Sequence, residues 1–153
     1  MATKGFETLE VYRLSERLAD SIWDVVVSWD HFAKSTVGSQ LVRAADSIGA
    51  NISEGTGRRS FKDNRRFVRI ARGSLNETKH FLRRAFKRQL LTQRAVNAIK
   101  PLMDELAPRL NAYLNSIGRD SPSRVRQSAP RSTSARTVNK GQRTKDKGQR
   151  TNS

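Results

Sequence analysis

Few side chains in this sequence have the type and spacing that catalysis needs. The two histidines, His31 and His80, are far apart, and neither has a carboxylate at the spacing of a metal ligand. Cysteine is absent, which excludes disulfides, thiolate metal sites and cysteine nucleophiles. No glycine-rich phosphate loop, nucleophile elbow or kinase signature is present. We therefore expect a protein that is not an enzyme, with no metal site and no cofactor.

One polar cluster has some of the ingredients of a nuclease site. Glu54 is followed by the turn Gly55-Thr-Gly57 and then by Arg58 and Arg59. A single carboxylate cannot hold the metal ions that most nucleases use. No strand is expected before the turn, so it does not have the context of a nucleotide-binding loop. A salt bridge at the end of a helix explains this cluster better than catalysis does.

Binding of a polyanion is the chemistry that the sequence does favour. The 153-residue chain has a net charge of +16, which is typical of proteins that bind nucleic acid. Residues 119–153 hold ten Lys/Arg and two Asp, a net charge of +8. Residues 58–88 hold twelve cations against two acids, a net charge of +10. The twelve are Arg58, Arg59, Lys62, Arg65, Arg66, Arg69, Arg72, Lys79, Arg83, Arg84, Lys87 and Arg88.

The cations between Lys62 and Lys87 have the spacing of one helix face. At about 100° per residue they fall within an arc of about 140°, opposite the apolar residues of the same segment. Like charges three and four residues apart repel each other, whereas a merely solvated face normally interleaves acids with bases. Residues 7–30 carry a net charge of −4 and could neutralise part of this strip, within or between subunits, but about six positive charges would remain. We therefore predict a nucleic-acid-binding face.

The apolar residues predict four helices that would position this face. Helical spacing extends over residues 7–29, 36–54, 60–90 and 92–117. Ser60 with Asp63 forms a variant capping box before the third helix, and Thr92 can cap the fourth. Pro101 and Pro108 fall inside the fourth segment, so we expect that helix to be kinked or split into shorter pieces. The predicted fold over residues 1–118 is an all-α four-helix bundle.

The first predicted helix carries a second apolar stripe beside its main one. Tyr12, Ala19 and Trp23 lie about a quarter turn away from the first stripe. Two explanations remain open. The helix could pack against two partners inside its own bundle, or the stripe could be an oligomer interface between subunits.

The composition changes after residue 118. Residues 119–153 are rich in Ser, Arg, Thr, Gln and Lys and have almost no large apolar residue, so we expect a disordered basic tail. The longest apolar run in the chain is three residues, such as Val25–Val27, which is too short for a secretory signal or a membrane span. We expect a cytoplasmic protein with no membrane partner.

Three stretches of the chain resemble a known family. The longest is Gln40-Leu-Val-Arg-Ala-Ala-Asp-Ser-Ile-Gly-Ala-Asn-Ile-Ser-Glu-Gly55, followed by Gly57-Arg58 and Ser60. The others are Phe6, Leu9 and Val11-Tyr12, and Phe67-Val-Arg-Ile-Ala-Arg-Gly73-Ser-Leu75 with Glu77. Together they resemble the bacterial 23S rRNA intervening-sequence proteins, also called the four-helix-bundle protein family. Gly49 stands where that family commonly has a proline.

This resemblance implies an antiparallel up-down four-helix bundle that assembles as a ring-shaped homopentamer and has no catalytic residues. It also implies a relation to accessory proteins of diversity-generating retroelements, which bind a reverse transcriptase and nucleic acid. We therefore expect a non-enzymatic oligomer that binds nucleic acid, RNA in the first place, through the third helix and the tail. The alternative is a protein-interaction scaffold or accessory subunit whose basic face docks an acidic partner such as a reverse transcriptase.

Overall fold

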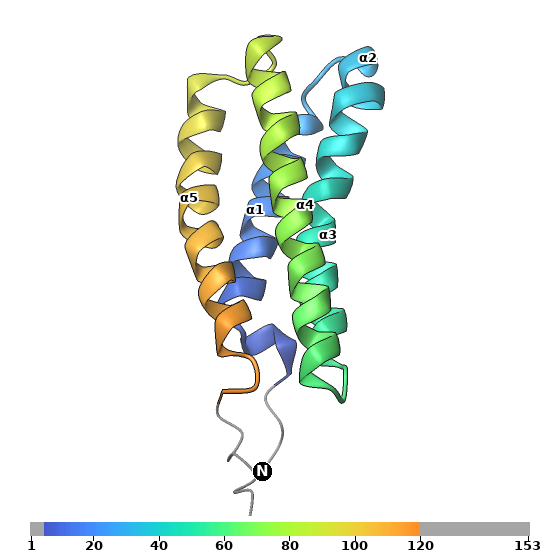
Figure 1. The fold of residues 1–153 in the computed structure, drawn as a ribbon. Coiled ribbons are helices and arrows are strands. Elements are labelled where there is room, and N and C mark those ends of the chain that lie inside the picture. The colour runs from blue at the N-terminus through green and yellow to red at the C-terminus, as the bar shows by residue number, and fades with distance from the viewer. Residues whose placement is uncertain (1–4, 120–153) are drawn as a thin grey trace, which may run out of the picture. The chain divides into compact units, whose positions relative to one another are not determined.

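The computed structural model of this chain describes residues 5–119 (Figure 1). A short 3-10 helix, η1 (Phe6–Thr8), precedes the first long helix, α1 (Glu10–Val26). The next helical stretch consists of α2 (His31–Ala33), a π-helical segment η2 (Lys34–Gly38) and α3 (Ser39–Thr56). The last two helices are α4 (Phe61–Lys87) and α5 (Gln93–Ser116). Within residues 5–119 there are no strands.

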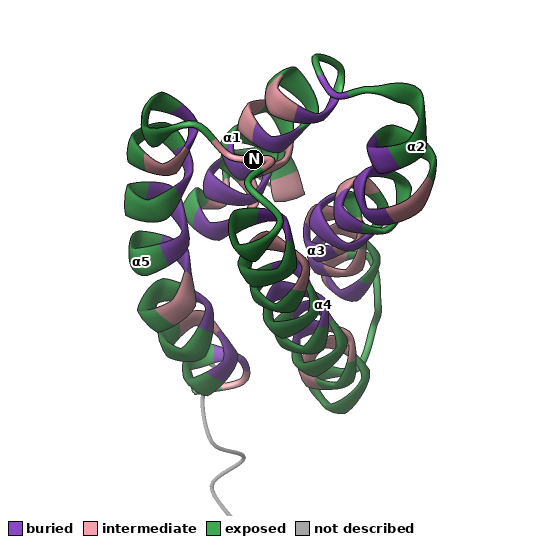
Figure 2. Cartoon of the chain, turned by 90° about the horizontal axis from the view of Figure 1, so that it is seen from above, coloured by how far each residue is buried: buried purple, intermediate pink, exposed green. Residues whose placement is uncertain are grey.

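The four long helices form an antiparallel up-down bundle, as the sequence predicts. The chain runs up α1, down α3, up α4 and down α5 (Figure 1). α1 packs against α3 and α5, and α4 also packs against α3 and α5, so that α1 and α4 lie diagonally across the bundle. The buried residues lie on the inner sides of the helices (Figure 2). The largest apolar side chains that are fully buried in this core are Leu14, Leu18, Ile22, Leu41, Ile48, Ile52, Leu75, Leu106 and Leu110.

The second helical stretch begins five residues earlier than the sequence predicts. Asp30 caps it, because the Asp30 carboxylate accepts a hydrogen bond of 3.0 Å from the backbone N–H of Ala33. The π-helical segment η2 then adds a residue to one turn, which moves the apolar positions off the 3.6-residue period. The predicted start at residue 36 was wrong because periodicity alone cannot detect this turn. The first helix is also shorter than predicted, since η1 and a turn replace its ends.

The last helix, α5, is continuous through both of its prolines. Pro101 and Pro108 are seven residues apart and exposed, so both lie on the outer side of the helix. The backbone carbonyls that lose their donor at these positions can be hydrated, and the core side of the helix is undisturbed. The predicted splitting into shorter pieces was therefore wrong. Thr92 caps this helix as expected, accepting a hydrogen bond of 3.1 Å from the N–H of Ala95.

The basic helix α4 is the longest element of the bundle. It has 27 residues, which corresponds to about 40 Å. Ser60 caps its start, accepting a hydrogen bond of 3.3 Å from the N–H of Asp63, as the capping box predicts. The helix ends at Lys87, and the turn that follows contains Gln89, whose φ of 61° lies in the left-handed region. The Leu90 N–H closes this turn by donating a hydrogen bond of 2.9 Å to the Ala85 carbonyl.

The predicted disordered tail, residues 119–153, lies outside the described residues except for Arg119. No helix within residues 5–119 is long and apolar enough to cross a membrane.

Candidate nucleic-acid interface

The cations of α4 between Lys62 and Lys87 form two rows along the helix. Four of them are exposed and neither form a hydrogen bond to α5 nor line the groove beside it, and we call them the outer row: Lys62, Arg66, Arg69 and Arg84. Five of them contact α5 or line the groove beside it, and we call them the inner row: Arg65, Arg72, Lys79, Arg83 and Lys87. All nine were predicted to bind nucleic acid, but only the outer row faces solvent without contact to another helix.

Two residues of the inner row tie α4 to α5. Arg65 is half-buried, and its guanidinium donates a hydrogen bond of 2.8 Å to the carbonyl oxygen of Ile117, at the end of α5. A cation at a helix C-terminus also interacts favourably with the helix dipole. Gly118 follows with a φ of 85°, which is the left-handed conformation that ends many helices. Two turns further along α4, the guanidinium of Arg72 donates a hydrogen bond of 3.4 Å to the side-chain oxygen of Asn111 on α5.

The first cation of the strip, Arg58, is held in place by local contacts. Arg58 forms an ion pair with Glu54 and lies over the ring of Phe67, 4.8 Å from the ring centroid. This ion pair confirms the salt-bridge interpretation of the Glu54 cluster. Arg59 is exposed beside it, and Arg88 is exposed at the other end of α4.

The positive charge of the two rows is not neutralised inside the described chain. Within residues 5–119, the ion pairs are Glu54–Arg58, Lys100–Asp104 and Glu105–Arg109, and each joins residues four apart on one helix. The acidic residues of α1 cannot reach α4 because the two helices are diagonal neighbours. Like charges on adjacent turns of α4 therefore repel each other in the isolated chain.

A gap divides the outer row near the middle of α4. Gly73, Asn76 and Glu77 occupy the exposed face between Arg69 and Arg84. A Cβ placed on Gly73 would have nothing within 4 Å, apart from the neighbouring turns of its own helix. The backbone is therefore bare at this point, and a ligand could approach it closely.

The second apolar stripe of α1 has two different environments. Tyr12 and Ala19 are half-buried, and Tyr12 packs edge-on against Phe6 with 4.8 Å between ring centroids. The Tyr12 ring also lies 3.5 Å from where a Cβ of Gly49 would be, so packing inside the bundle explains this residue. Trp23, in contrast, is 56% exposed. Internal packing therefore accounts for the Tyr12 end of the stripe but leaves Trp23 unexplained.

Carboxylates gather on the α1 side of the bundle. Glu16 and Asp20 on α1 line a small hollow together with Asp46 on α3. Burial, and then the neighbouring charge of Asp20, raises the pKa of Asp46 above its ordinary value. A hydrogen bond to Glu16, and then burial, raises the pKa of Tyr12 above its ordinary value. In the part of the chain that the structure describes, no three His, Cys, Asp or Glu side chains form a group that could hold a metal ion.

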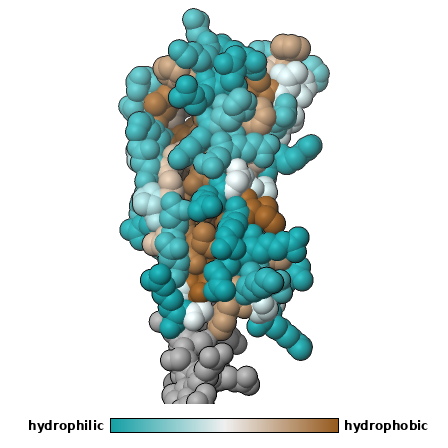
Figure 3. Space-filling model, viewed as in Figure 1, coloured by the Kyte–Doolittle hydropathy of each residue, from teal (hydrophilic) through white to brown (hydrophobic). Residues whose placement is uncertain are grey.

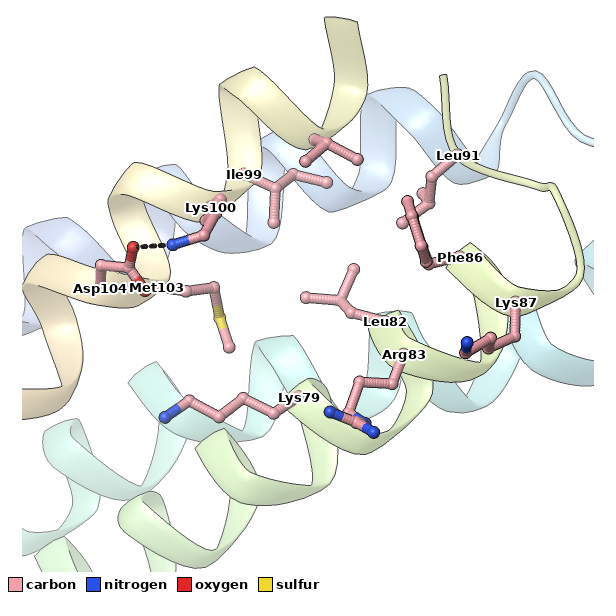
Figure 4. Close-up of a pocket in the computed structure, with 11 residues that line it drawn as sticks. Lys79, Leu82, Arg83, Phe86, Lys87, Leu91, Ile99, Lys100, Met103 and Asp104 are labelled. Carbon is pink, nitrogen blue, oxygen red and sulfur yellow. Dashed lines mark hydrogen bonds and ion pairs between the residues drawn. The ribbon is translucent and has the colours of Figure 1, made fainter. Parts of the chain in front are cut away.

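The structure also contains an apolar groove that the sequence pattern did not indicate. It lies between α4 and α5, where exposed apolar atoms form a strip bordered by hydrophilic side chains (Figure 3). Its volume is about 610 Å³. Leu82, Phe86, Leu91, Val96, Ile99 and Met103 line it, with Lys79, Arg83, Lys87, Lys100 and Asp104 at its edge (Figure 4). Phe86 has the spacing of a core residue, yet it is 57% exposed, because α5 does not close over it.

The fold and surface define a four-helix-bundle protein with one strongly basic helix. A family model described as 23S rRNA-intervening sequence protein matches residues 7–112, which is about two thirds of the chain and extends from the start of α1 into α5. This chain belongs to that family, as the sequence resemblance predicts. No curated protein matches it.

Proposed function

We propose that this protein is a non-enzymatic, oligomeric nucleic-acid-binding protein that contacts RNA phosphates through the outer row of α4. The observation that carries this proposal is that Lys62, Arg66 and Arg69 are exposed, adjacent and without an ion pair among residues 5–119. RNA is the first polyanion to test because the family description refers to 23S rRNA. The oligomer that the resemblance implies is a homopentamer, which would repeat the row in every subunit.

The physical driving force is release of counterions from the phosphates. A strip about 40 Å long can lie along several phosphates, and each cation that neutralises one of them releases condensed counterions. Sequence-specific reading of bases has less support. Phe67 and Phe81 are partly covered by the bundle. The exposed Phe61 and Phe86 lie on the α5 side of α4, beside Gly118 and in the α4–α5 groove, and not among the outer-row cations. Phosphate contacts should therefore dominate, and residues 119–153 should add to them through their net charge of +8.

The alternative function is a scaffold or accessory subunit that docks an acidic protein partner, such as a reverse transcriptase, on the same strip. The apolar groove beside the inner row favours this alternative, because phosphates need no apolar surface. The two functions differ in what the purified protein binds. A scaffold would bind RNA only after its protein partner is added.

The test measures binding of labelled single-stranded RNA by the purified full chain in a series of salt concentrations. Reversing the outer row with Arg66→Glu, Arg69→Glu and Arg84→Glu should weaken binding by well over tenfold and flatten the salt dependence. A variant with the same change in net charge elsewhere, Arg17→Glu, Arg94→Glu and Arg109→Glu, serves as the control and should keep most of the affinity. Circular dichroism should show the same helical content for all three proteins.

Deletion of residues 119–153 completes the comparison and should lower the affinity more modestly than the outer-row reversal does. If the deletion removes all binding and the reversal removes none, the tail binds RNA and the helix face is only solvated. If the purified wild-type chain binds no RNA at physiological salt, the proposed function is wrong and the scaffold is favoured.

A further inference from the structure

The groove between α4 and α5 needs an occupant that is both apolar and acidic. Phe86 is more than half exposed in it, and Lys79, Arg83 and Lys87 stand along its α4 edge. These three cations are spaced four residues apart, so they form a straight ridge about 12 Å long. All three come from the α4 side of the groove (Figure 4). The phosphates of a nucleic acid would neutralise the charge of this ridge, but they would leave the apolar floor of the groove exposed to water.

The same chain carries a surface with the complementary features. Trp23 and Val27, which are 56% and 46% exposed, lie on the outer face of α1. On the same face, Glu16, Asp20 and Asp24 are spaced four residues apart. They form a second straight ridge about 12 Å long, of opposite charge to the ridge on α4. Among residues 5–119, neither ridge has an ion-pair partner.

The two ridges lie at the same level of the bundle. α5 packs against both α1 and α4. The α5 residues beside each ridge therefore show how far along the bundle that ridge lies. Asp20 and Asp24 line a hollow with Asn97 and Pro101 of α5. The α4 ridge lines its groove with Val96, Lys100 and Met103, which belong to the same turns of α5. Since α1 and α4 run in the same direction, both ridges also have the same polarity (Figure 1).

We propose that the α4–α5 groove of one copy receives the outer face of α1 from a second copy. This inference rests on the oligomer of the proposed function and names its contact surfaces. Trp23 and Val27 would cover the groove floor, while Glu16, Asp20 and Asp24 would face Lys79, Arg83 and Lys87 in register. Each copy uses its groove once and its α1 face once, so the contact is heterologous. Because both surfaces lie at one level, successive copies stay in one plane, which is the arrangement that a closed ring requires.

This contact assigns different roles to the cations of α4. The ridge of Lys79, Arg83 and Lys87 is covered by the neighbouring copy, and its repulsion is relieved by the three carboxylates. The outer row remains exposed on every copy and is available for RNA. An acidic patch on one side of the bundle and a basic patch on the other are thus parts of one interface.

Charge exchange tests the contact. Two variants each reverse one side of it, Asp20→Lys with Asp24→Lys, and Lys79→Glu with Arg83→Glu. Like charges would then face each other, and the mass measured by light scattering at micromolar concentration should shift from oligomer to monomer for each variant. A chain that carries all four substitutions has complementary ridges again and should recover the oligomeric mass. Arg66→Glu with Arg69→Glu is the matched control on the same helix and should leave the mass unchanged.

The outcomes separate this contact from the proposed function. An oligomer whose mass is unchanged in both variants would overturn the contact and leave the oligomer itself standing. Monomers in both variants without recovery in the fourfold variant would also overturn it, because complementary ridges would then not suffice. A wild-type chain that is monomeric would overturn both the contact and the oligomer. RNA binding is measured separately by the outer-row reversal, so its failure is distinguishable from all three results.

Discussion

The outer and inner rows of α4 have the same residue types on the same helix, yet their surroundings differ. Arg66 in the outer row is exposed, whereas Arg65, the preceding residue, is half-buried and holds the end of α5 through the Ile117 carbonyl. Lys79 and Arg83 border an apolar groove, whereas Arg84 borders only solvent. A basic helix is therefore not one binding surface. Because α5 lies beside one side of α4, the outer-row cations are free to contact a ligand, whereas the inner-row cations contact α5 or border the groove next to it.

The largest difference between the rows should appear in RNA affinity. On an RNA short enough to touch one copy, Arg66→Gln with Arg69→Gln and Arg84→Gln should reduce the slope of log affinity against log salt by about 2, since each phosphate contributes about 0.7 for single strands. The inner-row triple Arg72→Gln, Lys79→Gln and Arg83→Gln should leave that slope nearly unchanged. Filter binding over a salt series measures both. Equal losses in the two triples would show that the rows do not differ in function.

For the free energy of unfolding the order should be reversed, with a larger loss from an inner-row substitution than from an outer-row one. Arg65→Ala removes a partly buried charged hydrogen bond and should lower the free energy of unfolding by about 1–2 kcal/mol. Arg66→Ala, on the exposed side of the same turn, should change it by less than about 0.5 kcal/mol. Urea denaturation followed by circular dichroism measures the difference. Equal stability of the two variants would mean that Arg65 is not a structural residue and belongs with the outer row.

The smallest expected effect concerns the bare backbone between the two parts of the outer row. Gly73→Ala should raise the free energy of unfolding by up to about 1 kcal/mol, because alanine is the better helix former and the site is open. Gly49→Ala is the control, since its Cβ would lie 2.9 Å from the Ser15 hydroxyl oxygen and should destabilise the α1–α3 contact. Thermal unfolding of both variants checks this. If Gly73→Ala proved destabilising, the outer face at Gly73 would not be open.

The features that the sequence predicted correctly depend on residues close together in the chain. Ser60 and Thr92 cap their helices through donors three residues away, and Glu54 pairs with Arg58 one helical turn later. The helical spacing of apolar residues likewise predicts the four helices, since each helix must bury one stripe, and the family resemblance adds their up-down order. The basic face of α4 could be read in the same way, because helical geometry alone places its cations on one arc.

The tertiary structure alone decided what depends on neighbours that are distant in sequence. The π-helical segment hid the true start of the second helix, and α5 stayed whole because its two prolines face solvent. Whether Phe86 is buried depends on how closely α5 approaches α4, and the same gap turns Lys79 and Arg83 toward a groove. Local sequence fixes which residues share a helix face. The packing of the helices decides which part of that face remains exposed, because a side chain is buried only where a second helix lies close against it.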